Sequence, residues 1–325
     1  MKVFLCCVFA AVLAFGADDL AEVYRVKGAV ALEARASEIL SDPSYWLERL
    51  GKVETRFGYF ESPKHLFIVD KAARKFFFYD YENNVLKRAA EYDATMGDAT
   101  GDKYKEGDNK TPVGVYRVTA KLKQGERLFD KYYGPLAFVT DYPNAFDRSL
   151  KKTGHGIWIH GFPLNGSRDN PNTKGCVAIE NDGLTSLDSS ADRAKIAVMI
   201  NESGVLEAKK EDLAAVMALL YEWRWAWKIN DLERYLGLYA DDFVRSDGIS
   251  KKEFDKIKRV IFGKGEKKRI EFSDIEVVPY PNSLNKVIYK ASFWQDYEAT
   301  THRSSRVKEL YLQKSGDRFK IALER

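Results

Sequence analysis

Cysteine and histidine are both scarce, with three cysteines and four histidines among 325 residues. Cys6 and Cys7 lie at the start of the chain, so Cys176 is the single cysteine in the rest of it. One cysteine cannot form an internal disulfide, which excludes a disulfide-stapled scaffold. The histidines are scattered and no second cysteine accompanies Cys176, so the sequence argues against a zinc site.

A large excess of charge of one sign is also missing. The chain has 52 Lys and Arg against 48 Asp and Glu, a net charge of +4. Nucleic-acid-binding domains usually carry a concentrated basic stripe, and the sequence shows none, so we predict no nucleic-acid partner. The mild positive balance suits an anionic polymer.

Long apolar runs are missing except at the N-terminus. Residues 1–16, MKVFLCCVFAAVLAFG, begin with Lys2, continue as a short apolar run and end in small residues. This is the pattern of a secretory signal peptide, whereas the alternative, an uncleaved anchor, would need a longer run to span a bilayer. We therefore expect export, loss of Cys6 and Cys7 with the signal, and no stable membrane span in the mature chain.

Hydrophobic periodicity predicts a short helical segment ahead of a mostly β domain. In residues 17–50 apolar residues recur at three- and four-residue steps, with an interruption at Gly28 and a cap or break at Asp42-Pro43. This segment is too small to hold a core, so it must pack on another domain or another subunit. Residues 51–203 predict strands, with a turn near 82–84 and a strand at 194–200 that closes the domain.

A second domain is predicted over residues 208–325. It begins with helical periodicity that breaks near 230–231, then continues as alternating segments with a hairpin turn at 314–318. This order predicts an α+β unit, a curved antiparallel sheet packed on helices. The aromatic stripe at 221–239 is either core or the wall of a pocket for an unknown small ligand or glycan, and core is the commoner use.

The two chemistry-bearing residues fall in one short stretch, IHGFPLNGSRDNPNTKGCVAIEN, residues 159–181. Strand alternation places His160 on one face of GIWIHG and Cys176 on one face of GCVAIE, with apolar residues opposite. Two such strands side by side would bring Cys176 and His160 together. The polar segment between them predicts a surface loop. The alternative is that Cys176 is an inert buried residue, which is the commoner role of a lone cysteine.

A thiol beside an imidazole supplies a nucleophile and its base. A free thiol has a pKa of about 8.5, and a neighbouring imidazolium stabilises the thiolate. The imidazole needs an acceptor for its other nitrogen, and the backbone carbonyl of Gly161 can serve. Backbone amides at Gly175 and Cys176 can form an oxyanion hole because glycine allows close approach.

These residues resemble the signature of the L,D-transpeptidase catalytic domain, also called the YkuD domain. His160-Gly161 is followed by Thr173-Lys174-Gly175-Cys176, upstream NKTPVGVYRV (109–118) resembles the family's Lys-Thr-Pro-x-Gly segment, and 133–148 resembles the stretch before the His strand. The resemblance covers about residues 60–203 and implies a β-sandwich-like catalytic domain. It implies that Cys176 is the nucleophile, His160 the general base and Gly161 its orienting residue, while Thr173 supports the cysteine loop.

The implied substrates are peptidoglycan stem peptides. Cysteine attacks the carbonyl at the L-centre of diaminopimelate, terminal D-Ala leaves, and the thioester passes to an amine or to water. Cross-linking members commonly carry Arg two residues after the cysteine, where this chain has Ala178. The resemblance therefore favours hydrolysis, with no metal or cofactor.

The domain order narrows the resemblance. A helical N-terminus, this catalytic domain and a C-terminal domain resembling nuclear transport factor 2 are similar to the cell-shape-determining L,D-carboxypeptidases of helical Gram-negative bacteria. That implies a periplasmic hydrolase that trims tetrapeptides to tripeptides, and an N-terminal segment that forms a homodimer. The alternatives are an L,D-transpeptidase that makes 3-3 cross-links, and a non-catalytic cell-wall-binding scaffold.

Further residues are candidates for substrate binding. Trp158 either lines the site beside His160 or packs in the core. Tyr133 is a candidate contact for the stem peptide, as is Arg148, for which a surface salt bridge is the simpler role. Lys174 adjoins the cysteine and can meet a substrate carboxylate, unless it is merely solvated, and Thr173 and Gly175 complete the predicted loop.

Overall fold

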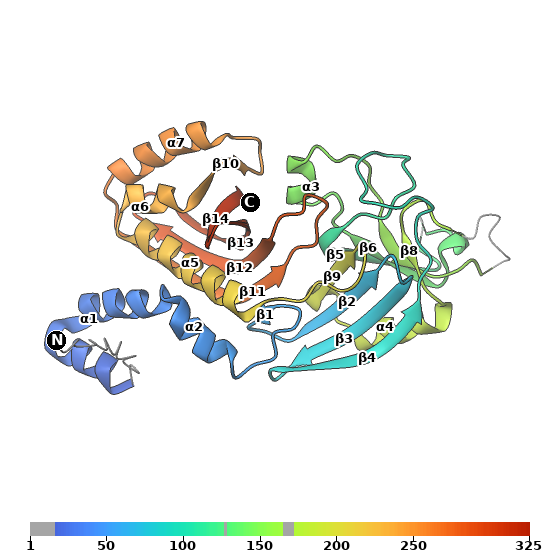
Figure 1. The fold of residues 1–325 in the computed structure, drawn as a ribbon, viewed down its shortest axis with the longest axis horizontal. Coiled ribbons are helices and arrows are strands. Elements are labelled where there is room, and N and C mark those ends of the chain that lie inside the picture. Colours follow the sequence, from blue (N-terminus) through green and yellow to red (C-terminus); the bar gives the residue numbers. More distant parts are fainter. Residues whose placement is uncertain (1–16, 127–128, 165–171) are drawn as a thin grey trace, which may run out of the picture.

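The structure is a computed structural model that describes residues 17–126, 129–164 and 172–325. The predicted signal peptide, residues 1–16, lies outside the described residues, as do residues 165–171 of the predicted surface loop. Figure 1 shows two lobes side by side, a mostly β lobe at the right and an α+β lobe at the left, with two N-terminal helices below the left lobe. Within the described ranges, no helix is both long and apolar enough to cross a bilayer.

The N-terminal segment forms two helices, α1 (Ala17–Leu40) and α2 (Pro43–Leu50). Gly28 interrupts α1 with a positive φ of 79°, and Asp42 caps α2 by accepting a hydrogen bond from the Ser44 amide. Both the interruption and the break were expected. Trp46 and Leu50 of α2 are buried in the core of the α+β lobe, so the segment packs on the C-terminal domain.

The mostly β lobe, which the sequence predicts to be the catalytic domain, is built on one mixed sheet in the order β4-β3-β2-β9-β5-β6-β7-β8. Its strands are β2 (Lys64–Asp70), β3 (Lys75–Glu82), β4 (Val85–Asp93), β5 (Gly114–Lys123), β6 (Leu136–Thr140), β7 (Trp158–His160), β8 (Val177–Ala178) and β9 (Ile196–Asn201). Short helices η1 (Lys131–Tyr133), α3 (Ala145–Ser149), α4 (Asn181–Ser190) and η2 (Arg193–Lys195) connect them. The predicted closing strand, β9, is central: it lies between β2 and β5.

This sheet bends at β5 into two layers. Phe67 of β2 and Phe138 of β6 are three strands apart, roughly 14 Å in a flat sheet, yet their ring centroids lie 5.4 Å apart. The bend coincides with an irregular register between Val118 and Ala120. The two layers enclose a core that α4 completes with Leu184 and Leu187, which gives the expected sandwich.

The C-terminal lobe contains a second sheet in the order β1-β11-β12-β13-β14-β10. Its elements are β1 (Tyr59–Phe60), α5 (Lys210–Lys228), α6 (Leu232–Gly237), β10 (Tyr239–Arg245), α7 (Lys251–Gly263), β11 (Lys268–Pro279), β12 (Ile288–Ala299), β13 (Arg303–Ser315) and β14 (Arg318–Glu324). The helix break at Asn230 and the turn between β13 and β14 fall where the sequence predicts them. The edge strand β1 comes from the segment that precedes the catalytic strands.

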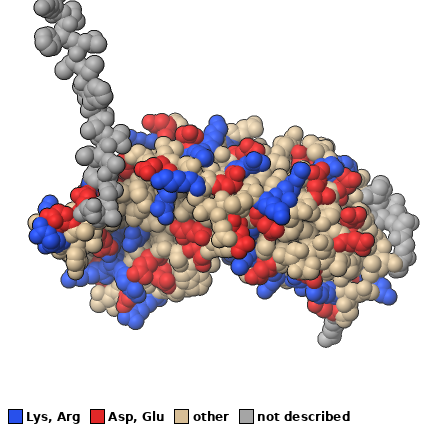
Figure 2. All heavy atoms as spheres, turned by 90° about the horizontal axis from the view of Figure 1, so that it is seen from below, with Lys and Arg blue, Asp and Glu red and all other residues tan. Residues whose placement is uncertain are grey.

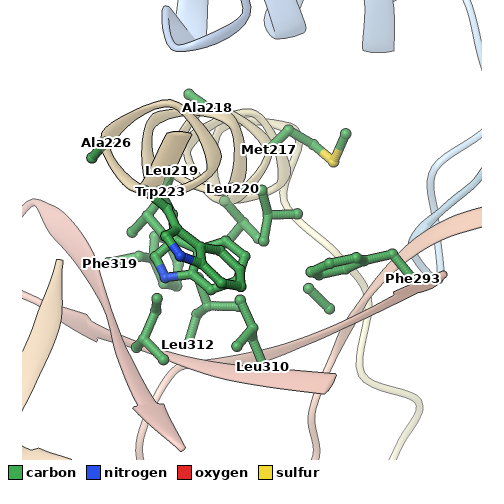
Figure 3. Packing of buried hydrophobic residues seen from close by; sticks show 14 of the residues in the cluster. Met217, Ala218, Leu219, Leu220, Trp223, Ala226, Phe293, Leu310, Leu312 and Phe319 are labelled. Carbon is green, nitrogen blue, oxygen red and sulfur yellow. The ribbon is translucent and has the colours of Figure 1, made fainter. Parts of the chain in front are cut away.

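The aromatic stripe fills the core of this lobe. In Figure 3, Trp223 points from α5 toward the strands that carry Leu310, Leu312 and Phe319. The Trp223 indole donates to the Tyr239 hydroxyl at 2.8 Å, and that hydroxyl donates to Glu324 at 2.7 Å. The expectation that the stripe is core is therefore confirmed for its buried members.

The two lobes share an aromatic core at their junction. Phe146 of α3 stacks on Tyr311 of β13 with ring centroids 5.3 Å apart, and its ring also meets Tyr280. The Asn144 amide, at the start of α3, donates to the Tyr280 hydroxyl at 2.9 Å. Apolar packing and a hydrogen bond therefore hold the second domain against the catalytic one.

Beside this core lies a buried cation, Lys152. Its ammonium is 2.6 Å from Asp102 and 2.9 Å from Asp147, and all three side chains are at most 2% exposed. Burial lowers the pKa of Lys152, but the two carboxylates outweigh burial and raise it above its usual value. Ser283 of the C-terminal domain donates to the same Asp102 at 3.0 Å, so the network joins both domains.

We predict that Lys152→Met lowers the free energy of unfolding by about 3 kcal/mol or more, because it leaves two buried carboxylates without a cation. Chemical denaturation of the purified protein measures this. Lys151→Met is the matched control, because Lys151 is the exposed neighbour and its loss should cost about 0.5 kcal/mol or less. Equal costs for the two variants would contradict the account.

Candidate active site

The strands that carry the histidine and the cysteine are neighbours. β7 and β8 pair in parallel, with Ile159 opposite Val177 and His160 opposite Ala178. Ile159 and Val177 are buried in the sandwich core, so alternation places His160 and Cys176 on the other face. The expected juxtaposition of the two strands is confirmed.

Cys176 is partly exposed, and backbone groups of the neighbouring segment surround its sulfur. The Trp158 amide donates to Sγ at 3.5 Å, and the thiol donates to the Gly156 carbonyl at 3.3 Å. A hydrogen bond donated to sulfur favours the thiolate over the thiol. The segment that leads into the His160 strand therefore holds the sulfur in place through one donor and one acceptor, Trp158 and Gly156.

His160 is buried and held in one orientation. Its Nδ1 lies 2.7 Å from the Gly161 carbonyl oxygen, which can only accept, so Nδ1 carries the proton and Nε2 is the basic nitrogen. This hydrogen bond confirms the acceptor expected from the sequence. The Tyr133 ring meets the imidazole edge-on at 5.1 Å, and the Tyr133 carbonyl accepts from the Gly161 amide at 2.9 Å.

Asn181 is a site residue that the sequence did not reveal. Its side chain accepts from the Phe162 amide at 2.8 Å and donates to the Phe162 carbonyl at 3.1 Å, which fixes the chain just after the His160 strand. A Cβ at Gly161 would overlap the Asn181 Oδ1 atom, so this position requires glycine. The contact joins the first residue of α4 to the end of β7, and no local pattern signals it.

Thr173 organises the loop that presents the cysteine. Its hydroxyl donates to the Cys176 carbonyl at 2.6 Å and accepts from the Gly175 amide at 3.1 Å, and its own amide donates to Met96 at 2.8 Å. This is the loop support that the resemblance implies. The Gly175 amide donates inside the loop, and the oxyanion hole expected from the amides of Gly175 and Cys176 stays a prediction.

The Lys-Thr-Pro-x-Gly segment lies directly beneath this loop. Gly175 has a φ of 132°, and a Cβ there would come within 2.6 Å of the Lys110 carbonyl oxygen. The Thr111 hydroxyl accepts from the Gly97 amide at 3.0 Å, and Gly97 bridges to Thr173. Two motifs more than sixty residues apart in sequence therefore form one support for Cys176.

The remaining predicted residues divide into two groups. Trp158 is half-buried, with its ring 4.9 Å from Tyr133, so both line the face that carries His160. Lys174 is exposed beside Cys176. Arg148 lies on α3, where its guanidinium donates to the Pro143 carbonyl rather than to the cysteine loop.

Ala178 occupies the position that commonly holds arginine in cross-linking members, and this position is buried. Ala178 has no exposed surface and exchanges two backbone hydrogen bonds with Thr95, at 2.8 and 2.7 Å. Among the residues that the structure describes, no three His, Cys, Asp or Glu side chains gather as a metal-ligand group.

Two family models match the chain. The L,D-transpeptidase catalytic domain matches residues 64–194, which include His160 and Cys176, and the Cds6 C-terminal NTF2-like domain matches residues 215–325. A search of curated proteins gave no match.

Solved structures resemble most of the chain. The helical cell shape determining protein Pgp2 from Campylobacter jejuni superposes with a TM-score of 0.81 and 36% identity, over 88% of this chain and 99% of that one. Bd1075 from Bdellovibrio bacteriovorus superposes with a TM-score of 0.65 and 28% identity, over 83% of this chain and 96% of that one. The chain therefore belongs to the L,D-transpeptidase (YkuD) family, as a member that joins the catalytic domain to a C-terminal NTF2-like domain.

Proposed function

We propose that the protein is a periplasmic peptidoglycan L,D-carboxypeptidase that removes terminal D-Ala from tetrapeptide stems and thereby affects cell shape. The pairing of β7 with β8 carries the proposal, because it sets a hydrogen-bonded thiol and an oriented imidazole on one face. The match to the catalytic domain supports the substrate class, and the similarity to Pgp2 supports the role in cell shape. The signal-peptide pattern of residues 1–16 supports export.

The reaction follows from the residues in place. His160 Nε2 takes the thiol proton, and Cys176 Sγ attacks the carbonyl carbon at the L-centre of diaminopimelate. The C–N bond to D-Ala breaks as His160 returns the proton to the leaving amine. Water then attacks the thioester, with His160 again accepting a proton, which releases the tripeptide and restores the thiol.

Hydrolysis rather than cross-linking is proposed on account of Ala178. A guanidinium at this position would be a fixed cation able to hold a carboxylate of the second stem. Here the position is buried against Thr95, with which Ala178 forms an isolated β-bridge, and the site lacks that cation. Water is then the expected acceptor of the acyl group.

We predict that the mature protein converts disaccharide-tetrapeptide to disaccharide-tripeptide, with the loss of one alanine by mass spectrometry. Cys176→Ala should lower the rate by about a thousandfold or more, because the nucleophile is gone. Unchanged thermal stability of the variant would show that folding is intact. Trimming by the Cys176→Ala protein would overturn the mechanism. Joined stems would indicate a transpeptidase, and no change in either sample would favour the scaffold alternative.

The variant Ala178→Arg tests whether the residue at position 178 determines which molecule accepts the acyl group. We predict that it lowers the melting temperature and yields no cross-linked stems, because the side chain must enter a buried position with no carboxylate placed for it. Ala89→Arg is the control, since Ala89 is exposed on β4 of the same sheet. Cross-linked dimers from a stable Ala178→Arg protein would contradict this prediction. They would show that residue 178 alone decides whether water or an amine accepts the acyl group.

The N-terminal segment is proposed to join two copies of the chain. Its helix α1 exposes Tyr24, Val26 and Val30 at 57%, 60% and 83%, and apolar side chains so exposed are candidates for an interface. We predict a dimer by size-exclusion chromatography with light scattering. Val26→Asp with Val30→Asp should give a monomer of unchanged trimming rate on disaccharide-tetrapeptide, and a monomeric wild type would refute the proposal.

A further inference from the structure

A cavity of about 330 Å³ lies where the two domains meet, away from the cysteine loop. Its walls come from β2, β5, β9 and η2 of the catalytic domain and from β11 and β12 of the C-terminal domain. Four of the lining residues are cations and one is a carboxylate: Lys64, Arg117, Arg193, Lys290 and Glu276. Figure 2 shows both signs of charge interleaved over one face of the molecule, so this bias is local.

Two of the four cations form close ion pairs with carboxylates of the protein. Lys64 lies 2.7 Å from Glu276, and Lys290 lies 2.9 Å from the buried Glu309. Burial alone would raise the pKa of Glu309, but Lys290 and Arg117 more than offset it and hold the pKa at about 2. The Lys64–Glu276 pair joins the two domains at the cavity wall, whereas the Lys290–Glu309 pair lies within the C-terminal domain.

Both arginines have N–H groups that make no hydrogen bond to the residues described. Arg117 directs its Nε toward Asp141 at 3.4 Å and toward Glu309 at 3.7 Å, and its terminal amino groups make no hydrogen bond to the residues described. Arg193, which is exposed, donates to the Thr119 carbonyl through one amino group, and within the described ranges its other nitrogens make no such bond. The planar guanidinium fork matches a carboxylate, which can accept two hydrogen bonds.

The cavity lies within reach of a polymer held at the cysteine. β5, which lines the cavity, and β8, which follows Cys176 directly, are three strands apart in the same sheet. None of the residues that line the cavity belongs to the cysteine loop, so a stem bound at Cys176 leaves the cavity to a second stem of the same polymer.

We propose that this interdomain cavity is a second binding site for the wall polymer, which takes a carboxylate of a stem peptide other than the one being cut. The proposal rests on the proposed function for the identity of the polymer. The guanidinium groups of Arg117 and Arg193 hold the carboxylate, and the C-terminal domain closes the cavity behind it. The C-terminal domain then contributes directly to substrate binding.

Arg193→Gln and Lys195→Gln form a matched pair for the test. Both residues are exposed on η2, and Arg193 lines the cavity while Lys195 does not. The full mature protein carrying Cys176→Ala, which cannot turn the polymer over, is bound to intact sacculi at low and high salt. Arg193→Gln should weaken binding about threefold to tenfold at low salt and less at high salt, while Lys195→Gln should not.

A second measurement separates this site from the active site. In the protein with Cys176 intact, Arg193→Gln should leave the rate on disaccharide-tetrapeptide, which has a single stem, unchanged. Equal binding of sacculi by the two glutamine variants would overturn the proposal. So would an equal loss of rate on the single-stem substrate, because the cavity would then belong to the active site.

Two further results would separate this proposal from the proposed function and from a free-anion site. Sacculus binding by the Cys176→Ala protein does not require turnover, so a wild type that trims nothing would refute the proposed function and leave the binding test valid. A calorimetric titration with inorganic phosphate tests for a free-anion site. Phosphate binding that Arg193→Gln abolishes, without any change in sacculus binding, would replace the polymer by a small anion and overturn the proposal.

Discussion

The buried ammonium of Lys152 is the interaction on which most of the site depends. It neutralises Asp102 and Asp147 in a region with almost no exposure, where either carboxylate alone would be costly. Asp102 also accepts from the Val113 amide, at 2.9 Å, and from Ser283 of the second domain. Asp147 caps the start of α3, whose Phe146 packs on the second domain.

The cysteine loop is therefore supported from both domains. Val113 belongs to the segment that carries Lys110 and Thr111, and that segment lies against Gly175 and Gly97. A hydroxyl, a carbonyl and two glycines fix the backbone, and the thiol is placed as a result. The proposed reaction uses only the side chains of Cys176 and His160. Their placement depends on a hydrogen-bond network that extends into the other lobe.

Much of this organisation could be predicted from the sequence, because local patterns signal local structure. Alternation around His160 and Cys176 predicts two strands with both residues on one face, and the Gly161 carbonyl was a foreseeable partner for the imidazole. The break at Asn230 also follows from short-range chemistry.

The rest depends on contacts that join distant segments. Asn181 reaches the site only because α4 begins beside the end of β7. The Thr173 hydroxyl engages the Gly175 amide, and a sequence does not show which of two partners a donor takes. The central place of β9 likewise follows from tertiary packing rather than from periodicity.

The edge strand β1 and helix α2 precede the catalytic strands, yet both complete the other lobe. The catalytic domain is thus inserted within a domain whose pieces come from both sides of it. During synthesis the C-terminal lobe cannot close until β10 to β14 have emerged, although Trp46 and Tyr59 left the ribosome first. A single cut of the chain near residue 208 would leave the C-terminal lobe without helix α2 and edge strand β1. The two lobes therefore cannot be separated there without loss of structure.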